Sequence, residues 1–252
     1  MSINPRLEPF TILADVYKVS GLSAYGTTLA ARLLNFIYDM NWEGSNLLDL
    51  ASGNGEVACW FAGRNIRAIG VDSSANMIKH AKALADEQNA AATFIQADIR
   101  TYQADSPADL VLCIGGSLNY LPTMNDLGAA FRAAAAACAP QKPFIFDLHT
   151  IRGLSNAPAE RIISDGEHHL ITARNAFSYE TLSLNTLYTV FHYVAGWQRA
   201  EEMHTLRGYP VQAVQRLLNS SGFTLEKALT LDFAPMTAST EADMLLLVAR
   251  RT

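Results

Sequence analysis

The stretch LLDLASGNGEVACWFA, residues 47–62, decides how this sequence folds. Its apolar start suits a buried strand, its end suits a helix, and the residues between them must form a tight turn. Gly53 and Gly55 can adopt a positive φ and let the backbone of that turn approach a ligand closely. The helix that follows presents free N–H groups to the same place. The stretch therefore predicts a strand–turn–helix unit with a ligand at the turn.

These glycines alone leave two alternatives open. The spacing Gly53-x-Gly55-x-x-Ala58 also satisfies the dinucleotide-binding fingerprint, and a strand can turn into a helix without binding anything. The next strand supports a ligand, because Asp72 stands at its end and can accept two hydrogen bonds from the cis-hydroxyls of a ribose. The alternative for Asp72 is a helix N-cap. Asp98 ends the third strand and could meet an adenine edge, or could be an ordinary turn residue.

Outward from this stretch, short apolar runs alternate with helix-length segments. We expect strands at 46–50, 66–71, 92–96, 108–114 and 143–148, and helices at 56–62, 74–87 and 125–139. Strands separated by helices indicate βαβ units and a parallel sheet. Several of these runs are almost continuously apolar, which is typical of strands covered by helices on both faces.

The flanking regions complete the predicted fold. Residues 9–40 predict two amphipathic helices, and residues after 150 predict an antiparallel meander with strands at 168–178, 182–194 and 198–206. A helix at 211–219 and strands at 224–233 and 243–249 follow. The fold class is thus α/β, a Rossmann-like, mostly parallel seven-stranded sheet with helices on both faces and an antiparallel β-meander insertion.

Composition excludes several kinds of partner. The chain has 252 residues, half of them hydrophobic, and a formal net charge of −5 without any run of Lys and Arg, so we expect no nucleic-acid partner. Three scattered cysteines form no CxxC pair and indicate neither a disulfide framework nor a zinc site. The first nine residues lack a signal pattern, and the longest uncharged stretch is broken by glycines and a proline. We therefore expect a cytoplasmic globular protein with no membrane partner.

The order of motifs resembles a known family. DLASGNGE, GVDSSANMI, ADI, DLVLCIGGSLNYL and FIFDLHT are similar to the class I S-adenosylmethionine-dependent methyltransferases, above all to their small-molecule branch of glycine and nucleotide-sugar N-methyltransferases. The resemblance covers residues 10–150 and continues more weakly to EMHTLRGYPVQAVQRLLNSSGF. It implies an enzyme that transfers a methyl group from S-adenosyl-L-methionine to a small-molecule acceptor by in-line displacement.

The resemblance also implies a cofactor-binding set. Asp49 and the 51–55 backbone would hold the methionine end, Asp72 the ribose, Met77 one adenine face and Asp98 the exocyclic amine. Tyr17 resembles the tyrosine that covers the cofactor from an N-terminal lid, and Tyr25 is a second candidate for that lid. The full set is Tyr17, Tyr25, Asp49, Ala51, Gly53, Gly55, Asp72, Ser73, Met77, Ala97, Asp98, Ile99, Cys113 and Gly115. The sequence departs from the family at Ala51, where a glycine is usual, and at Gln141-Lys142, which replaces a Gly-Gly turn.

The acceptor should lie beyond the carboxyl ends of the strands. There we expect His149, Asn119 and Tyr120 to face the transferred methyl group as catalytic candidates. His192, His204 and Arg207 on the meander are candidates for binding the acceptor; packing residues and a surface ion pair are the alternatives. His168 and His169 are adjacent and point to opposite faces of a strand, so we expect no metal site.

The sequence predicts a single domain, 1–252, with four parts. They are an N-terminal helical lid (1–40), the cofactor-binding core (41–150), the acceptor-site insertion (151–209) and the closing helix and strands (210–252). The motifs carry no information on the oligomeric state.

Two other functions compete with methyl transfer. An NAD(P)-dependent oxidoreductase of the short-chain type needs Tyr-x-x-x-Lys, and none of the nine tyrosines has a lysine four positions later. A non-catalytic module that binds the adenosyl cofactor would differ only in lacking a reactive second pocket. Methyltransferases of nucleic acids are disfavoured, because the fourth strand ends in Gly-Gly-Ser-Leu-Asn and the sequence contains no Pro-Cys dipeptide.

Overall fold

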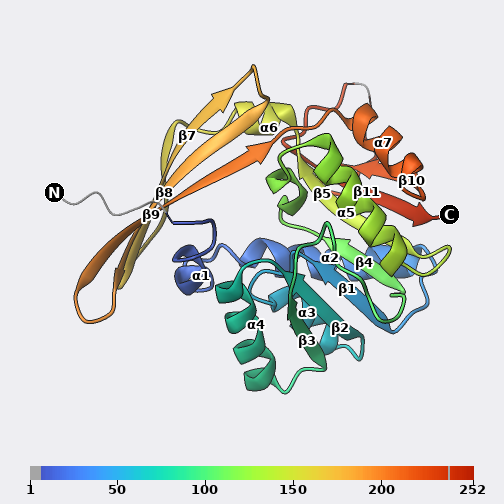
Figure 1. Cartoon of the computed structure of the whole chain (residues 1–252), viewed down its shortest axis with the longest axis horizontal. Coiled ribbons are helices and arrows are strands. Elements are labelled where there is room, and N and C mark those ends of the chain that lie inside the picture. The colour runs from blue at the N-terminus through green and yellow to red at the C-terminus, as the bar shows by residue number, and fades with distance from the viewer. Residues whose placement is uncertain (1–6, 238) are drawn as a thin grey trace.

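Two β-sheets organise the chain, and the computed structural model describes residues 7–237 and 239–252 (Figure 1). The larger sheet has seven strands in the order β10-β11-β5-β4-β1-β2-β3. Their bounds are β1 Asn46–Leu50, β2 Arg67–Asp72, β3 Ala92–Gln96, β4 Leu110–Cys113, β5 Pro143–His149, β10 Phe223–Leu229 and β11 Met244–Arg251. Strands β1 to β5 pair in parallel, whereas β11 runs antiparallel to both β5 and β10. The predicted Rossmann-like sheet is confirmed.

The strand order creates a topological switch point at the carboxyl ends of the parallel strands, called the crevice below. From β1 the chain moves outward through β2 to β3, then crosses to β4 on the other side of β1. Helices that follow β1 and β4 therefore leave toward opposite faces, so the connections after these two paired strands diverge. Ligands of open α/β sheets bind at such a switch point.

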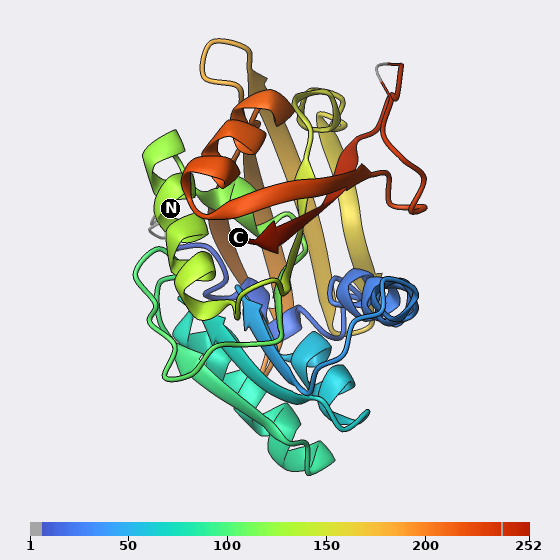
Figure 2. The ribbon, with the colours of Figure 1, turned by 90° about the vertical axis from the view of Figure 1, so that its right-hand side faces the viewer.

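Two cores cover the two faces of the sheet. Helices α2 (Ala24–Asp39), α3 (Glu56–Ala62) and α4 (Ala75–Gln88) pack on one face, and α5 (Met124–Ala137) and α7 (Val211–Ser220) pack on the other. Figure 2 shows α2 on one side of the sheet and α5 with α7 on the opposite side. Alternate residues of a strand pack into the two different cores; in β1, Leu47 packs into the core of α2, α3 and α4, and Leu48 into that of α5 and α7. Burial on both faces explains why these strands read as continuous apolar runs.

The insertion between β5 and α7 forms the second sheet. It contains α6 (Ile151–Ser155) and the antiparallel strands β6 (Glu160–Gly166), β7 (His169–Ser178), β8 (Ser183–Tyr193) and β9 (Trp197–Arg207). The predicted meander is confirmed, but it has one strand more than the sequence suggested. Strand β6 begins with exposed charged residues and shows no regular alternation of burial, so it carries little periodic signal.

The amino-terminal region lies between the two sheets. The short helix α1 (Leu13–Val16) contacts α4 and packs its apolar residues against the second sheet (Figure 1). A 3-10 helix, η1 (Ser117–Tyr120), follows β4 and contacts both β5 and β9. Across residues 7–237 and 239–252, none of the helices combines the length and apolar character that crossing a bilayer requires.

Candidate functional site

The turn after β1 has a left-handed backbone at three positions. Ala51, Gly53 and Gly55 have φ values of +57°, +54° and +80°. A Cβ built at Gly55 would lie 2.6 Å from the Phe94 ring, so this glycine allows the turn to pack on the sheet. A Cβ at Gly53 would meet nothing within 4 Å, so this glycine faces open space. The two glycines thus have different roles, one in packing and one at the crevice.

Asp72, at the end of β2, fastens this turn. Its Oδ2 accepts a hydrogen bond from the Gly53 N–H at 2.9 Å, and its Oδ1 accepts one from the Ser74 N–H at 2.8 Å. Burial raises the pKa of the carboxyl, and the N–H donors oppose that rise. The N-cap of α4 is Ser74, whose Oγ accepts from the Met77 N–H, and not Asp72. Together with the Ser73 N–H, these donors leave part of the acceptor capacity of the carboxylate for a further donor.

Asp49, on β1, is a buried carboxyl group with an unused oxygen. Its side chain is 2% exposed, and within the described residues its Oδ2 has no hydrogen-bond partner. The nearby Ser52 Oγ is buried and unpartnered in the same way. Burial, and then the charge of Asp72, raise the pKa of Asp49 to about 8. Such a pair of acids fits a ligand that brings a cation and hydroxyl donors into the crevice.

The remaining predicted cofactor residues lie at strand ends and in α4. Met77 is buried in α4, and Ser73 is exposed at the end of β2. Asp98 forms an ion pair with Arg100 at 2.5 Å, and this guanidinium lowers the pKa of the Asp98 carboxyl. The same arginine also binds Asp126. The other members of the set lie at the ends of β3 and β4: Ala97, Ile99, Cys113 and Gly115.

Sequence reasoning missed Asp147, which shapes the loop after β4. This fully buried carboxylate of β5 accepts from the N–H groups of Gly115 and Gly116 at 3.0 and 2.6 Å, and from the Tyr25 hydroxyl at 2.5 Å. The structure thereby places Tyr25 at the carboxyl end of β4. A signal existed in the sequence, because Asp147 interrupts the apolar run FIFDL, and a buried carboxylate must be hydrogen-bonded.

Asn119 and His149 meet at the end of β5. The Asn119 amide donates to the backbone oxygens of His149 and Arg207, and its Oδ1 accepts from the His149 N–H at 2.9 Å. These bonds join η1, β5 and β9. The His149 ring packs against the backbone of Gly116, where a Cβ would lie 2.6 Å from its Cδ2. Burial lowers the pKa of His149, and Arg161 adds to that effect.

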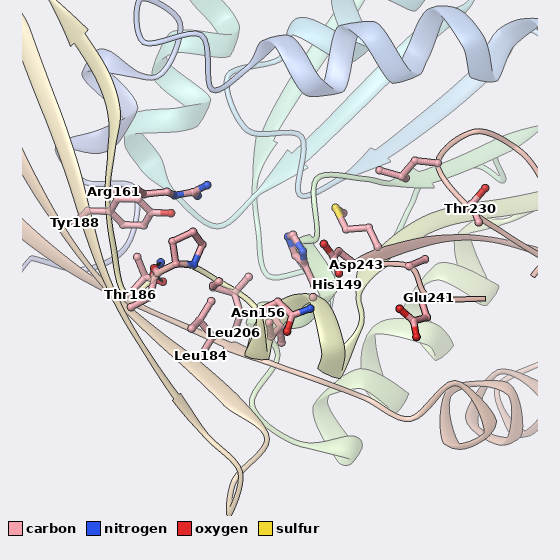
Figure 3. A pocket seen from close by; sticks show the side chains of 18 of the residues that line it. His149, Asn156, Arg161, Leu184, Thr186, Tyr188, Leu206, Thr230, Glu241 and Asp243 are labelled. Atoms are coloured by element: carbon pink, nitrogen blue, oxygen red, sulfur yellow. Dashed lines mark hydrogen bonds between the residues drawn. The ribbon is translucent and has the colours of Figure 1, made fainter. Parts of the chain in front are cut away.

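A cavity of about 630 Å³ opens beside His149, between the second sheet, α6 and the segment before β11. A volume of this size suits a small molecule. Figure 3 shows the Arg161 guanidinium extending from the second sheet in the direction of His149, with Tyr188 next to it. Further polar lining comes from Asn175 and Thr186, which bond to each other.

The three candidates on the meander lie elsewhere. His204 is fully buried between Glu202 and Tyr120, with ring nitrogens 2.9 Å from the Glu202 Oε2 and 2.7 Å from the Tyr120 hydroxyl. His192 lines a second cavity of about 470 Å³ at the far end of the sheet, beside α1. Arg207 donates to the Pro122 oxygen at 2.6 Å. Among the residues described, none of these three lines the larger cavity, whose lining from the second sheet is Arg161, Asn175, Leu184, Thr186, Tyr188 and Leu206.

Metal ligands do not gather anywhere in the part of the chain that the structure describes, where no three His, Cys, Asp or Glu side chains form a metal-binding group.

Comparisons with known proteins agree with this geometry. Residues 47–141 match a family model described as a methyltransferase domain. YqeM of Bacillus subtilis (strain 168), classed by name among the methyltransferases, is 25% identical over 83% of this chain and 85% of its own. A solved S-adenosylmethionine-dependent methyltransferase of Clostridium acetobutylicum superimposes with a TM-score of 0.78 and 19% identity, over 88% of this chain and 90% of that one.

A second solved structure matches the whole length. The sugar N-methyltransferase KedS8 of Streptoalloteichus superimposes with a TM-score of 0.77 and 20% identity, over 100% of this chain and 98% of that one. At such identities the structural likeness establishes the fold. The match therefore includes the second sheet as well as the parallel core.

Proposed function

We propose that the chain is a class I S-adenosylmethionine-dependent methyltransferase, that the crevice at the ends of β1 and β2 holds this cofactor, and that the cavity beside His149 holds a small-molecule acceptor. One observation carries the proposal: a buried, unpartnered Asp49 oxygen lies at the same turn as Asp72, which retains free acceptor positions. The ammonium and ribose hydroxyls of S-adenosylmethionine supply the cation and the donors that these two acids lack.

The proposed cofactor contacts follow from these positions. Asp49 and Ser52 would receive the methionine end, with the open side of Gly53 allowing close approach of the backbone. Asp72 would accept both ribose hydroxyls, and the Met77 side chain would contact the adenine. When bound, S-adenosylmethionine supplies a methyl group on a sulfonium that is already electrophilic. The protein then has to align the acceptor and exclude water.

Tyr17 is placed to help with that exclusion. It packs in a cluster with Tyr188 of the second sheet, and burial, with smaller contributions from Tyr188 and Asp72, raises the pKa of its hydroxyl to about 12. A tyrosine that keeps its proton can donate a hydrogen bond there but cannot act as a base.

His149 is the proposed proton acceptor. Its lowered pKa keeps the imidazole neutral near pH 7, and a neutral ring nitrogen can take a proton from an amine or hydroxyl acceptor. Arg161 supplies a positive charge to the same cavity; of the acids at its rim, Glu241 and Asp243 share Arg152, and Asp232 pairs with Arg32. We therefore propose an acceptor that carries an anionic group as well as an amine or hydroxyl. KedS8, by its name, methylates a sugar nitrogen, which agrees with an amine acceptor.

The predicted domain boundaries, the acceptor class and the location of the protein also belong to this proposal. We propose the same division into lid (1–40), core (41–150), insertion (151–209) and closing segments (210–252), and a protein that acts on small molecules in the cytoplasm. No observation favours hydride transfer or a non-catalytic module.

Turnover provides the test of the proposal. The purified protein is incubated with S-adenosylmethionine and a panel of amines, hydroxylated metabolites and nucleotide sugars, each with and without an anionic group. We expect release of S-adenosylhomocysteine with anionic members of the panel. Release only with neutral acceptors would contradict the role of Arg161, and cofactor binding without release from any member would favour the non-catalytic module.

A further inference from the structure

Glu202, in the middle of β9, is a carboxylate with no exposed surface. Its Oε1 accepts from the backbone N–H groups of Ile12 and Leu13 at 2.5 and 2.9 Å. Its Oε2 accepts from the Phe10 N–H at 2.8 Å and pairs with His204 Nε2 at 2.9 Å. Two donors on each oxygen fill the acceptor capacity of the group. Burying a carboxylate is costly unless it is bonded in this way, so Glu202 is built to hold the 10–13 backbone.

The opposite side of this segment is bonded to the cofactor half of the molecule. Ser74 Oγ donates to the Phe10 oxygen at 3.0 Å, and Asn76 Nδ2 donates to the Thr11 oxygen at 2.6 Å. Farther along, the Asp15 carboxylate pairs with His80 at 2.9 Å. Segment 10–17 therefore bridges β9 of the second sheet and α4 of the core. It passes over the start of α4, next to Asp72.

The bridge fixes the place of Tyr17. The apolar residues of α1 pack against Ile171 and Val190 of the second sheet, and the Tyr17 ring joins that cluster beside Tyr188. If the segment left Glu202, the Tyr17 side chain would lose its position in that cluster.

His204 extends the same network to the acceptor side. Because a carboxylate only accepts, Nε2 carries the proton toward Glu202, which leaves Nδ1 to accept from the Tyr120 hydroxyl. Burial raises the pKa of Tyr120 well above its usual value, so this hydroxyl keeps its proton and can donate. Tyr120 belongs to η1, directly after the Gly115–Gly116 loop that Asp147 holds.

We propose that Glu202 is a positioning residue that clasps segment 10–17 over the bound cofactor and, through His204 and Tyr120, couples this closure to the η1 loop beside the acceptor. The inference rests on the proposed function. Cofactor exchange then requires the backbone of residues 10–13 to leave Glu202, and the cofactor and acceptor sides of the site assemble together.

The test compares Glu202→Gln with Glu201→Gln. The control makes the same chemical change at the adjacent residue, whose side chain lies on the other face of β9 and pairs with Arg199. Stopped-flow fluorescence measures S-adenosylhomocysteine dissociation, and hydrogen exchange measures the amides of residues 10–17. We expect dissociation about tenfold faster or more, and faster exchange at residues 10–13, in Glu202→Gln alone. Equal behaviour of the two variants would overturn the proposal.

Two further variants keep the test decisive if Glu202→Gln does not fold. Asn76→Ala removes the bond to Thr11 from the other side, and Tyr120→Phe removes only the hydroxyl that reaches His204. Both should accelerate dissociation and exchange, and no change in either would refute the clasp. The exchange measurement needs no ligand, so it tests the clasp even if the wild-type protein fails to bind S-adenosylhomocysteine, a result that would count against the proposed function instead.

Discussion

The backbone N–H of Gly53 donates a hydrogen bond to Asp72 Oδ2 at 2.9 Å, which ties the turn after β1 to the end of β2. Asp72 thus orients the loop and at the same time keeps acceptor positions for a ligand. The same carboxylate holds the loop in place and is proposed to bind the ribose hydroxyls.

Replacing Asp72 by alanine should therefore weaken cofactor binding strongly. Losing two charge-assisted hydrogen bonds to ribose hydroxyls costs roughly 2–4 kcal/mol, a tens- to several-hundred-fold loss of affinity. Titration calorimetry with S-adenosylhomocysteine measures the affinity, and Asp86→Ala, at an exposed position on α4, is the control. Unchanged affinity with only a lower Tm would mean that Asp72 merely organises the turn.

Asp49→Asn should have opposite effects on stability and on binding. The pKa of Asp49 is raised to about 8 in the folded protein, from 3.8. The folded state holds this proton more tightly, so the contribution of Asp49 to stability is full at low pH and is lost as pH rises through the folded pKa. Asparagine does not titrate. Without ligand, the variant should gain up to about 1.4 kcal/mol per pH unit over wild type across that window, while its affinity for S-adenosylhomocysteine falls. Thermal unfolding between pH 5 and 8 measures the trend, and a pH-independent difference would contradict it.

Ala51→Gly should stabilise the protein. Ala51 stands where related loops have glycine, and its φ of +57° is unfavourable for a residue with a Cβ. Relief of that strain exceeds the extra chain entropy of glycine by about 0.5–1 kcal/mol. Gln141, the other departure from the family pattern, has a φ of +63°, so Gln141→Gly should shift the Tm in the same direction. A lower Tm in both variants would show that other contacts outweigh the backbone strain.

The parallel core was predictable because its signals are local. Apolar runs, the Gly53–Gly55 turn and the acids at strand ends lie within short stretches, and the structure has the corresponding strands and helices. The clasp was not predictable, because Glu202 reaches the backbone of residues 10–13 across about 190 positions. In sequence, Glu202 reads as an ordinary charged residue on a strand.

The residues that line the proposed acceptor cavity were also not predictable from the sequence. Sequence reasoning selected His192, His204 and Arg207 by residue type, but whether a meander residue reaches the cavity depends on its place along the strand. His204 and His192 lie on the same face of the sheet as Thr186 and Tyr188, which line the cavity. However, Tyr120 covers His204, and His192 lies beyond the cavity. Arg161 was not predicted as a site residue because strand β6, which carries it, was not predicted.

His149 and Arg161 should together set the acid limb of the pH–rate profile. The neutral form of His149 is the active one, and its lowered pKa places the loss of activity below pH 6.5. Arg161→Gln removes a positive charge that lowers this pKa, so the limb should move to higher pH; Arg174→Gln, an exposed arginine on β7, is the control. An unmoved limb in Arg161→Gln would contradict the assignment.

His149→Ala separates chemistry from binding. It should reduce kcat by about 10²–10⁴-fold, the usual contribution of a general base, and leave affinity for S-adenosylhomocysteine nearly unchanged. Steady-state rates on an acceptor from the panel, with calorimetry alongside, measure both. Full turnover in His149→Ala would assign proton removal to another group or to water.

Binding of the cofactor itself is the most direct test of the proposed ligand site at Asp49 and Asp72. Titration calorimetry of the wild-type protein compares S-adenosylmethionine and S-adenosylhomocysteine with NADH under the same conditions. The unpartnered Asp49 oxygen and the free acceptor positions of Asp72 predict saturable binding of both adenosyl ligands and a clear preference over NADH. Tight binding of NADH, with no heat signal from either adenosyl ligand, would contradict it.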